Sequence, residues 1–315
     1  VTMSTDSYCT LTKRNVILFG EALADIFPDG PVMGGAPLNV SCHLQAFGLH
    51  PMLITRTGTD ELHRKLIRLM RNAGMTISGI QSDPHYPTGQ VLIKPGENGY
   101  GHQFEILENQ AYDFIDPVTA ATAASSIEPD LVYFGTLAQR SRLSGSALET
   151  IFRYTPQTPR LLDINLRKPW YTRDTVRYSL TRADHVKVNE DELIELPGLL
   201  NLHTRDPRDT ASRLIEEFQL HTLLVTCGAE GAWLLDQSGN EAETPGITDI
   251  TVIDTVGAGD GFSAVFILGM LLGWPETLTL ERANRFAAAL CGIRGAIPES
   301  SEFYSPFLRD WGMIN

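Results

Sequence analysis

A short glycine-rich segment of the sequence ends in a carboxylate. The run from Asp254 to Asp260 (DTVGAGD) follows Ile250–Ile253, which predicts a strand, and precedes an apolar stretch that predicts a helix. Glycines in such a loop point free N–H groups at one spot, and the helix N-terminus adds partial positive charge. Asp260 could there accept a proton from an attacking hydroxyl, so the segment suits phosphoryl transfer. The alternative is a strand–helix turn in which Asp260 caps the helix.

The segment differs from two common glycine-rich nucleotide motifs. The sequence contains no Gly-Lys-Ser/Thr, so it lacks the P-loop of many NTPases. No Gly-x-Gly-x-x-Gly follows the first predicted strand, which argues against a dinucleotide-dependent oxidoreductase.

Alternating strand-like and helix-like runs must position this segment. We expect strands at 15–21, 51–57, 131–134, 160–164, 185–189, 222–226, 232–236 and 250–253. We expect helices after Gly34–Asn39 and at 60–73, 143–154, 206–218, 260–272 and 280–292. Repeated strand–helix units predict an open, mostly parallel sheet with helices on both faces. Ligands bind at the carboxyl ends of such strands, so the loops there are the candidate site.

One pair of strand-like runs interrupts this alternation. Gln90–Lys94 and His102–Leu107 flank Pro95–Gly99, and an Asn-Gly pair between such runs is a strong hairpin signal. We therefore expect a small appended sheet here.

Length and composition limit the class of protein. The chain has 315 residues, of which 43% are hydrophobic and 20% charged, as in a globular protein with a sizeable core. A formal net charge of -13 disfavours nucleic acid and anionic membranes as partners. Four scattered cysteines without a CxxC pair indicate reduced thiols, and the polar stretch Val1–Leu11 predicts no signal peptide. We expect a cytoplasmic protein.

Six blocks of the sequence together resemble the ribokinase-like (PfkB) carbohydrate kinases. Asp254–Asp260 resembles the C-terminal signature of that family, and Gly34–Val40 (GGAPLNV) resembles its N-terminal signature in the form seen in fructokinases. The remaining four blocks occur in the right order: Gly20–Asp25, Asp163–Arg167, Asn189–Glu192 and Thr226–Ala232. The resemblance implies an α/β fold, the ribokinase-like three-layer α/β/α sandwich with a mostly parallel central sheet and a small β lid. It also implies a core of residues 11–24, 34–85 and 113–315, and a lid of residues 25–33 and 86–112.

The resemblance also implies roles for residues of the glycine-rich segment. Asp260 is similar to the catalytic base, which takes the proton of the sugar's primary hydroxyl as that hydroxyl attacks the γ-phosphate of ATP. The backbone of Gly257, Ala258 and Gly259 would form the anion hole. Arg167 could hold a phosphate or a sugar oxygen, since its guanidinium suits both.

For the nucleotide, the matching positions are Lys187, Asn189, Thr226, Gly228, Gly231 and Asn284. Asn189 and Glu192 match an Asn-x-x-Glu motif that positions Mg²⁺ largely through water. The alternatives are a solvated helix face for Glu192 and an ordinary helix-surface amide for Asn284.

A monovalent cation is a further element of the resemblance. Asp254, with the backbone near Val256 and Gly295, resembles the K⁺ site that many family members use to order the anion hole. The cofactors implied are ATP and Mg²⁺, with K⁺ as an optional addition.

For the sugar, the matching positions are Asp25, Gly34, Gly35, Asn39, Asp163 and Asn165. Carboxylates and amides suit paired hydrogen bonds to neighbouring hydroxyls. Asp25 as a cap and Asn39 as a helix-start hydrogen bond are the structural alternatives. One departure concerns Glu108 and Asn109, which stand where many relatives carry an Arg, and this weakens the case for an acidic sugar.

The resemblance thus implies an ATP-dependent sugar kinase, with fructose converted to fructose 6-phosphate as the leading interpretation. The alternatives are a 2-keto-3-deoxygluconate kinase or another PfkB-family sugar kinase, and a non-catalytic sugar-binding regulator on the same fold. The expected partners are a small-molecule sugar and ATP, and a second copy of the chain bound through the lid.

Overall fold

The computed structural model of the protein describes residues 14–95 and 102–314, in which strands and helices alternate along the chain. The strands of the large sheet are β1 (Asn15–Phe19), β4 (His50–Thr57), β5 (Ile80–Ser82), β8 (Leu131–Phe134), β9 (Arg160–Asp163), β10 (His185–Asn189), β11 (Thr222–Thr226), β12 (Gly231–Asp236) and β13 (Glu241–Pro245). The α-helices are α2 (Ala36–Ala46), α3 (Glu61–Asn72), α4 (Pro117–Ser125), α5 (Arg142–Tyr154), α6 (Arg173–Arg182), α7 (Glu190–Leu200), α8 (Pro207–Phe218), α9 (Ala258–Leu272), α10 (Glu276–Leu290) and α11 (Ser305–Asp310).

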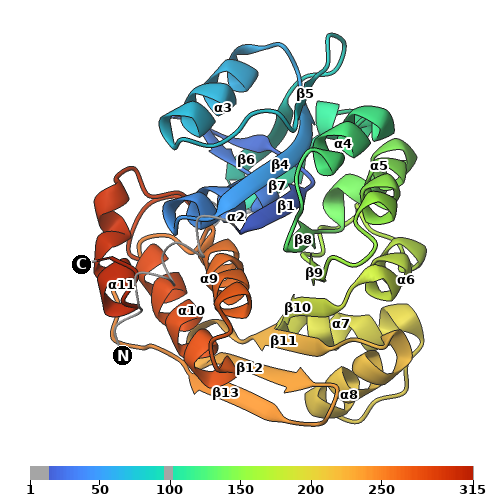
Figure 1. Cartoon of the computed structure of the whole chain (residues 1–315), viewed down its shortest axis with the longest axis vertical. Coiled ribbons are helices and arrows are strands. Elements are labelled where there is room, and N and C mark those ends of the chain that lie inside the picture. The colour runs from blue at the N-terminus through green and yellow to red at the C-terminus, as the bar shows by residue number, and fades with distance from the viewer. Residues whose placement is uncertain (1–13, 96–101, 315) are drawn as a thin grey trace.

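The large sheet has nine strands in the order β13-β12-β11-β10-β9-β8-β1-β4-β5. All neighbours from β11 to β5 pair in parallel, and β12 and β13 are antiparallel additions at one end. Helices cover the sheet on both sides (Figure 1). The predicted mostly parallel sheet between two helix layers is therefore confirmed. No helix within the described ranges is long and apolar enough to cross a bilayer.

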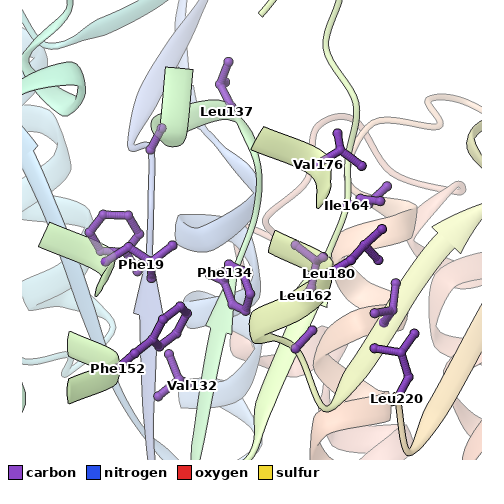
Figure 2. Packing of buried hydrophobic residues seen from close by; sticks show 14 of the residues in the cluster. Phe19, Val132, Phe134, Leu137, Phe152, Leu162, Ile164, Val176, Leu180 and Leu220 are labelled. Atoms are coloured by element: carbon purple, nitrogen blue, oxygen red, sulfur yellow. The ribbon is translucent and has the colours of Figure 1, made fainter. Parts of the chain in front are cut away.

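The sheet is buried on both faces, which explains the continuous apolar runs of its strands. Successive side chains of β1 point to opposite faces, so Val16 and Leu18 join one core while Ile17 and Phe19 join the other. The first core lies under α2, α9 and α10, and the second under the helices from α4 to α8. Figure 2 shows the second core, where Phe19, Phe134 and Phe152 pack together.

A second sheet has four strands in the order β3-β2-β6-β7. They are β2 (Leu23–Phe27), β3 (Gly30–Gly34), β6 (Gly89–Pro95) and β7 (His102–Ile106). β6 and β7 form the predicted antiparallel pair, and β2 joins β6 in parallel. The predicted Asn98-Gly99 turn lies outside the described residues, as do residues 11–13 at the start of the predicted core.

The strand predicted at Ile250–Ile253 is wrong. The turn after β12 leads instead into β13, which takes the antiparallel place beside β12. Val252 and Ile253 are 57% and 65% exposed, and the Ile253 N–H donates to the Cys291 carbonyl rather than to a strand. β13 was missed because just Ala242 and Thr244 of its five residues are buried, so it lacks an apolar run.

The helices α4, α6 and α7 were also not predicted. α4 (PVTAATAAS) buries alanines alone, so it shows no stripe of large apolar residues. α7 contains Pro197 in its interior, which normally signals a break. In both helices tertiary packing outweighs a weak local signal.

An aromatic cluster attaches the C-terminal segment to the first core. Phe286 of α10 is fully buried, and its ring centroid lies 5.1 Å from those of Phe47 and Phe307. Replacing a buried Phe by Ala removes these contacts and leaves a cavity.

We therefore expect Phe286→Ala to lower the free energy of unfolding by about 3–5 kcal/mol. Urea unfolding followed by tryptophan fluorescence measures the change. The matched control is Tyr154→Ala, since Tyr154 is an aromatic residue with 60% of its surface exposed, and it should have little effect. Equal losses for the two variants would contradict the packing role.

Candidate active site

The predicted site residues gather at one edge of the large sheet. Asp163 ends β9, Asn189 ends β10 and Thr226 ends β11. Glu21, which was not among the predicted residues, follows β1 at the same edge. Because these strands are parallel, their carboxyl ends meet at the same edge. Residues more than two hundred positions apart in the sequence therefore share one site.

The glycine-rich segment is locked at the start of α9. Gly257 has φ +81°, and a Cβ there would lie 2.2 Å from the Cβ of Ala296, so a larger residue does not fit. Asp254 Oδ1 accepts from the Val256 N–H at 3.0 Å, and Oδ2 accepts from the Gly295 N–H at 2.9 Å. The structure thus brings together the three residues predicted for K⁺, and it leaves the first-turn N–H groups of α9 free of helical partners.

Asp260 lies in the first turn of α9, partly buried. Its Oδ2 accepts from Asn39 Nδ2 of α2 at 2.7 Å. Burial raises the pKa of Asp260, against the opposing effects of that hydrogen bond and of the Lys187 and Arg167 charges. Asn39 Oδ1 is buried and has no hydrogen-bond partner among the residues that the structure describes. The Asp260 carboxylate, which can accept a proton, therefore lies beside Asn39, whose amide oxygen can still accept a hydrogen bond.

Two further carboxylates lie beside the glycine pair that precedes α2. A Cβ at Gly34 would come within 3.2 Å of Asp25 Oδ2, and one at Gly35 within 2.8 Å of the Glu21 carbonyl oxygen. Burial raises the pKa of Glu21 to about 7 and that of Asp25 to about 6, although the Arg167 charge opposes both shifts. Glu21 was not predicted as a site residue. A glutamate directly after a buried apolar strand is the signal that could have revealed it.

A narrow cavity lies between Glu21 and the start of the Asp163–Arg167 block. Its walls include Glu21, Tyr133, Thr136, Asp163 and Asn165. Asn165 adopts a left-handed conformation with φ +44°, which places it in a tight bend after β9. The predicted sugar-binding residues Asp163 and Asn165 therefore line one cavity with Glu21.

Asp163 is the centre of a buried hydrogen-bond network. Its Oδ2 accepts from Lys187 Nζ at 2.9 Å, from Ser263 Oγ at 2.8 Å and from the Tyr133 hydroxyl at 3.1 Å. Burial acts to lower the pKa of Lys187, but the Asp163 carboxylate outweighs it and the pKa is raised. Tyr133 and Ser263 were not predicted, because single hydroxyls within apolar elements carry no motif.

Asn189 and Glu192 form a reciprocal cap at the start of α7. Asn189 Oδ1 accepts from the Glu192 N–H at 2.8 Å, and Glu192 Oε2 accepts from the Asn189 N–H at 2.9 Å. Glu192 Oε1 accepts from the Leu166 N–H at 2.8 Å. The Glu192 side chain is buried, so the structure rules out the solvated helix face that was its alternative. The Glu192 side chain therefore links Asn189 to Leu166 of the Asp163–Arg167 block.

The predicted nucleotide residues fall into two groups. Thr226 and Gly228 follow β11 at the site edge, and a side chain at Gly228 would meet open space. Gly231 and Asn284 contact β13 instead. A Cβ at Gly231 would lie 2.1 Å from the Thr244 carbonyl oxygen, and Asn284 Nδ2 donates to the Pro245 carbonyl at 2.8 Å. The Asn284 amide is buried rather than on the helix surface.

Two arginines differ sharply in their surroundings. Arg167 is exposed and lies close enough to Glu21, Asp25 and Asp260 to oppose the rise in each pKa. Arg140 is buried, and it was not predicted. It donates to both Asp113 oxygens at 2.7 and 2.8 Å, and to the Leu107 carbonyl at 2.7 Å.

Comparison with known proteins identifies the family of the chain. The model of the pfkB family carbohydrate kinases matches residues 30–302. A fructokinase of Klebsiella pneumoniae is 26% identical, over 93% of this chain and 96% of that protein. A 2-dehydro-3-deoxygluconokinase of Thermoproteus tenax is 26% identical, over 86% of this chain and 83% of that protein. The structure of fructokinase from Vibrio cholerae O395, bound to fructose, ADP and calcium ion, has a TM-score of 0.78 at 22% identity and covers 93% of this chain and 99% of that chain.

The matched range contains both signature segments, Gly34–Val40 and Asp254–Asp260. It spans far more than half of the 315 residues. The similarity to the solved fructokinase shows a shared fold over nearly the whole chain. The resemblance inferred from six sequence blocks is confirmed: the chain belongs to the pfkB family of carbohydrate kinases and is a sugar phosphotransferase.

Proposed function

We propose that this kinase transfers the γ-phosphoryl group of ATP to the primary hydroxyl at C6 of fructose. One observation carries the proposal: the Asp260 carboxylate at the N-terminus of α9 is hydrogen-bonded to Asn39 of the GGAPLNV segment. The proton acceptor for a hydroxyl is thus fixed beside the segment expected to bind the sugar. The similarity to proteins named fructokinases supports fructose as the substrate.

The sugar would lie between the second sheet and the large sheet. Asp25 and the unpartnered Asn39 Oδ1 would accept from sugar hydroxyls, and Asn165, which lies beside Glu21, would bind a further hydroxyl. Positions 34 and 35 require glycine, because a side chain at Gly34 would crowd the Asp25 carboxylate and one at Gly35 would collide with the Glu21 backbone.

In the proposed reaction, Asp260 accepts the proton of the C6 hydroxyl while that oxygen forms a bond to the γ-phosphorus. The bond from the γ-phosphorus to the bridging oxygen breaks, and ADP leaves with that electron pair. The backbone N–H groups of Gly257, Ala258 and Gly259 would bind the phosphoryl oxygens at the positive end of α9. Arg167 would neutralise further charge from the open side of the site.

ATP and its ions fit the donor groups at this edge. Thr226, Gly228, Gly231 and Asn284 would border the nucleotide. Asn189 and Glu192 would hold Mg²⁺ through water, since both Glu192 oxygens already accept backbone N–H groups. Bound Mg²⁺ would neutralise phosphate charge. Asp254 and the backbone near Val256 and Gly295 would hold K⁺ and so order the anion hole.

We further propose that the second sheet is a lid over the sugar. Asp25 pairs with Val32 and Val91 in register, so the carboxylate shares one face with an apolar strip that would exclude water. The outer strands β3 and β7 each have one neighbour in this sheet, and Phe104 on β7 is exposed. Such edges suit pairing with a second copy of the chain, as a homodimer.

The second candidate substrate is 2-keto-3-deoxygluconate, favoured by the similarity to the Thermoproteus tenax enzyme. Its carboxylate would need a cation at the position of Glu108 and Asn109, where many relatives carry an Arg. Arg140 does bring a guanidinium to Leu107, next to Glu108 and Asn109, but its Nε and Nη2 already donate to Asp113 and to the Leu107 carbonyl. We therefore favour a neutral ketohexose.

The proposed substrate is tested by ADP release from Mg-ATP with fructose, 2-keto-3-deoxygluconate, ribose, adenosine, glucose and no sugar. We expect a clear rate with fructose and little with the others, because the site offers acceptors for neutral hydroxyls. Turnover of another sugar alone would overturn fructose but retain the mechanism. No sugar-dependent ADP release with any of them would favour the non-catalytic regulator.

Asp260→Asn should lower turnover by roughly 100- to 10,000-fold, because the amide cannot take the hydroxyl proton. Fructose binding, measured by calorimetry, should persist since Asn39 and Asp25 remain. Asp249→Asn makes the same chemical change at an exposed carboxylate and serves as the control. Near-full activity of Asp260→Asn would refute the proposed base.

The raised pKa of Asp260 predicts the pH dependence. A base must be deprotonated, so kcat/KM is full at high pH and falls as the pH decreases through a value above the ordinary aspartate range. The Arg167 charge opposes this rise in pKa. Arg167→Ala should therefore move the acid limb, the fall of kcat/KM at low pH, to higher pH. Arg167→Lys keeps the positive charge, so the pH of its acid limb should stay close to that of the unmodified protein. Coincident acid limbs for the two variants would contradict the assignment.

A further inference from the structure

The buried network around Asp163 needs an explanation beyond folding. Four residues from four elements converge in it: Tyr133 of β8, Asp163 of β9, Lys187 of β10 and Ser263 of α9. Their exposed fractions are 1%, 4%, 6% and 0%. Removing an ammonium and a carboxylate from water is costly, and buried ion pairs can often be replaced by apolar residues without loss of stability. Stability alone therefore does not explain why this network is charged.

The position of the ammonium suggests what the charges are for. A Cβ at Gly259 would lie 3.6 Å from Lys187 Nζ, so the charge sits directly beneath the glycine that precedes Asp260. Ser263 Oγ also lies 3.0 Å from the Gly259 carbonyl oxygen, which connects the network to the glycine-rich segment. Gly259 itself is exposed on the site side, so the buried charge and the open anion hole are separated by one backbone segment.

This geometry and the proposed phosphoryl transfer lead to one inference. We propose that the Lys187 ammonium stabilises the charge that develops on the transferring phosphoryl group, and that Asp163 and Ser263 are positioning residues that hold it there. A charge in a water-poor site acts more strongly than one in water, and it is fixed before the reaction begins. Asp163 is then a support for the anion hole through Oδ2, in addition to lining the cavity.

The inference predicts an effect on turnover rather than on ground-state binding. Charge on the phosphoryl group develops along the reaction, so the ammonium should favour the transition state over bound ATP. Lys187→Met keeps an unbranched side chain that is one atom shorter and removes the charge. We expect kcat to fall by roughly 100-fold or more, with the KM for ATP changed by less than about 3-fold.

A binding measurement that needs no turnover provides an independent test. ADP with aluminium fluoride, without a sugar, mimics the transferring phosphoryl group. Lys187→Met should weaken binding of ADP with aluminium fluoride by roughly 100-fold and leave binding of ADP alone within about 3-fold. Because this readout does not depend on which sugar is phosphorylated, it separates failure of this inference from failure of the fructose assignment.

A double variant distinguishes electrostatics from folding. Lys187→Met alone leaves the buried Asp163 carboxylate without its counter-charge, which should lower the thermal midpoint. Lys187→Met combined with Asp163→Asn removes both charges, so stability should recover while turnover stays low. Recovery of wild-type turnover by the double variant, or unchanged binding of ADP with aluminium fluoride by Lys187→Met, would overturn the inference. Lys65→Met on α3 controls for the loss of a lysine elsewhere.

Discussion

The buried Asp163 carboxylate holds the edge of the sheet that carries the proposed active site together. One of its oxygens accepts three hydrogen bonds from three different elements, so β8, β9, β10 and α9 are aligned at a single atom. A carboxylate in an apolar interior tolerates little change of geometry, because each lost donor leaves charge unsatisfied. The position of α9, and with it the glycine-rich segment, therefore depends on this group.

The α9 N-terminus combines two constraints that meet at Asp260. Gly257 is packed so closely on Ala296 that the turn must be glycine, and Asp254 fixes the same turn from the other side. Asn39 then ties Asp260 to α2, whose own start requires Gly35. The proposed proton acceptor, anion hole and sugar-binding segment are thus positioned by backbone packing, which suits a reaction that depends on positioning.

Much of this arrangement could be predicted from local signals. Apolar runs such as Asn15–Phe19 predicted the buried strands, and the glycine spacing of Asp254–Asp260 predicted a tight turn before a helix. The same logic failed at Ile250–Ile253, where the apolar side chains remain exposed. An apolar run shows that a strand is possible. It does not show whether the place beside a neighbouring strand is free. Here β13 takes the place beside β12, so residues 250–253 form no strand.

The sequence by itself determined the family, the strand–helix alternation and the residues at the strand ends, because these follow from short-range spacing and ordered motifs. Only the tertiary structure decided what each site residue faces. Lys187 and Ser263 are 24 and 100 positions from Asp163, and nothing local indicates that they share its oxygen. Likewise, the charge of Arg140 is committed to Asp113 across 27 positions. Such pairings arise when elements pack, since burial forces each polar group to find a partner.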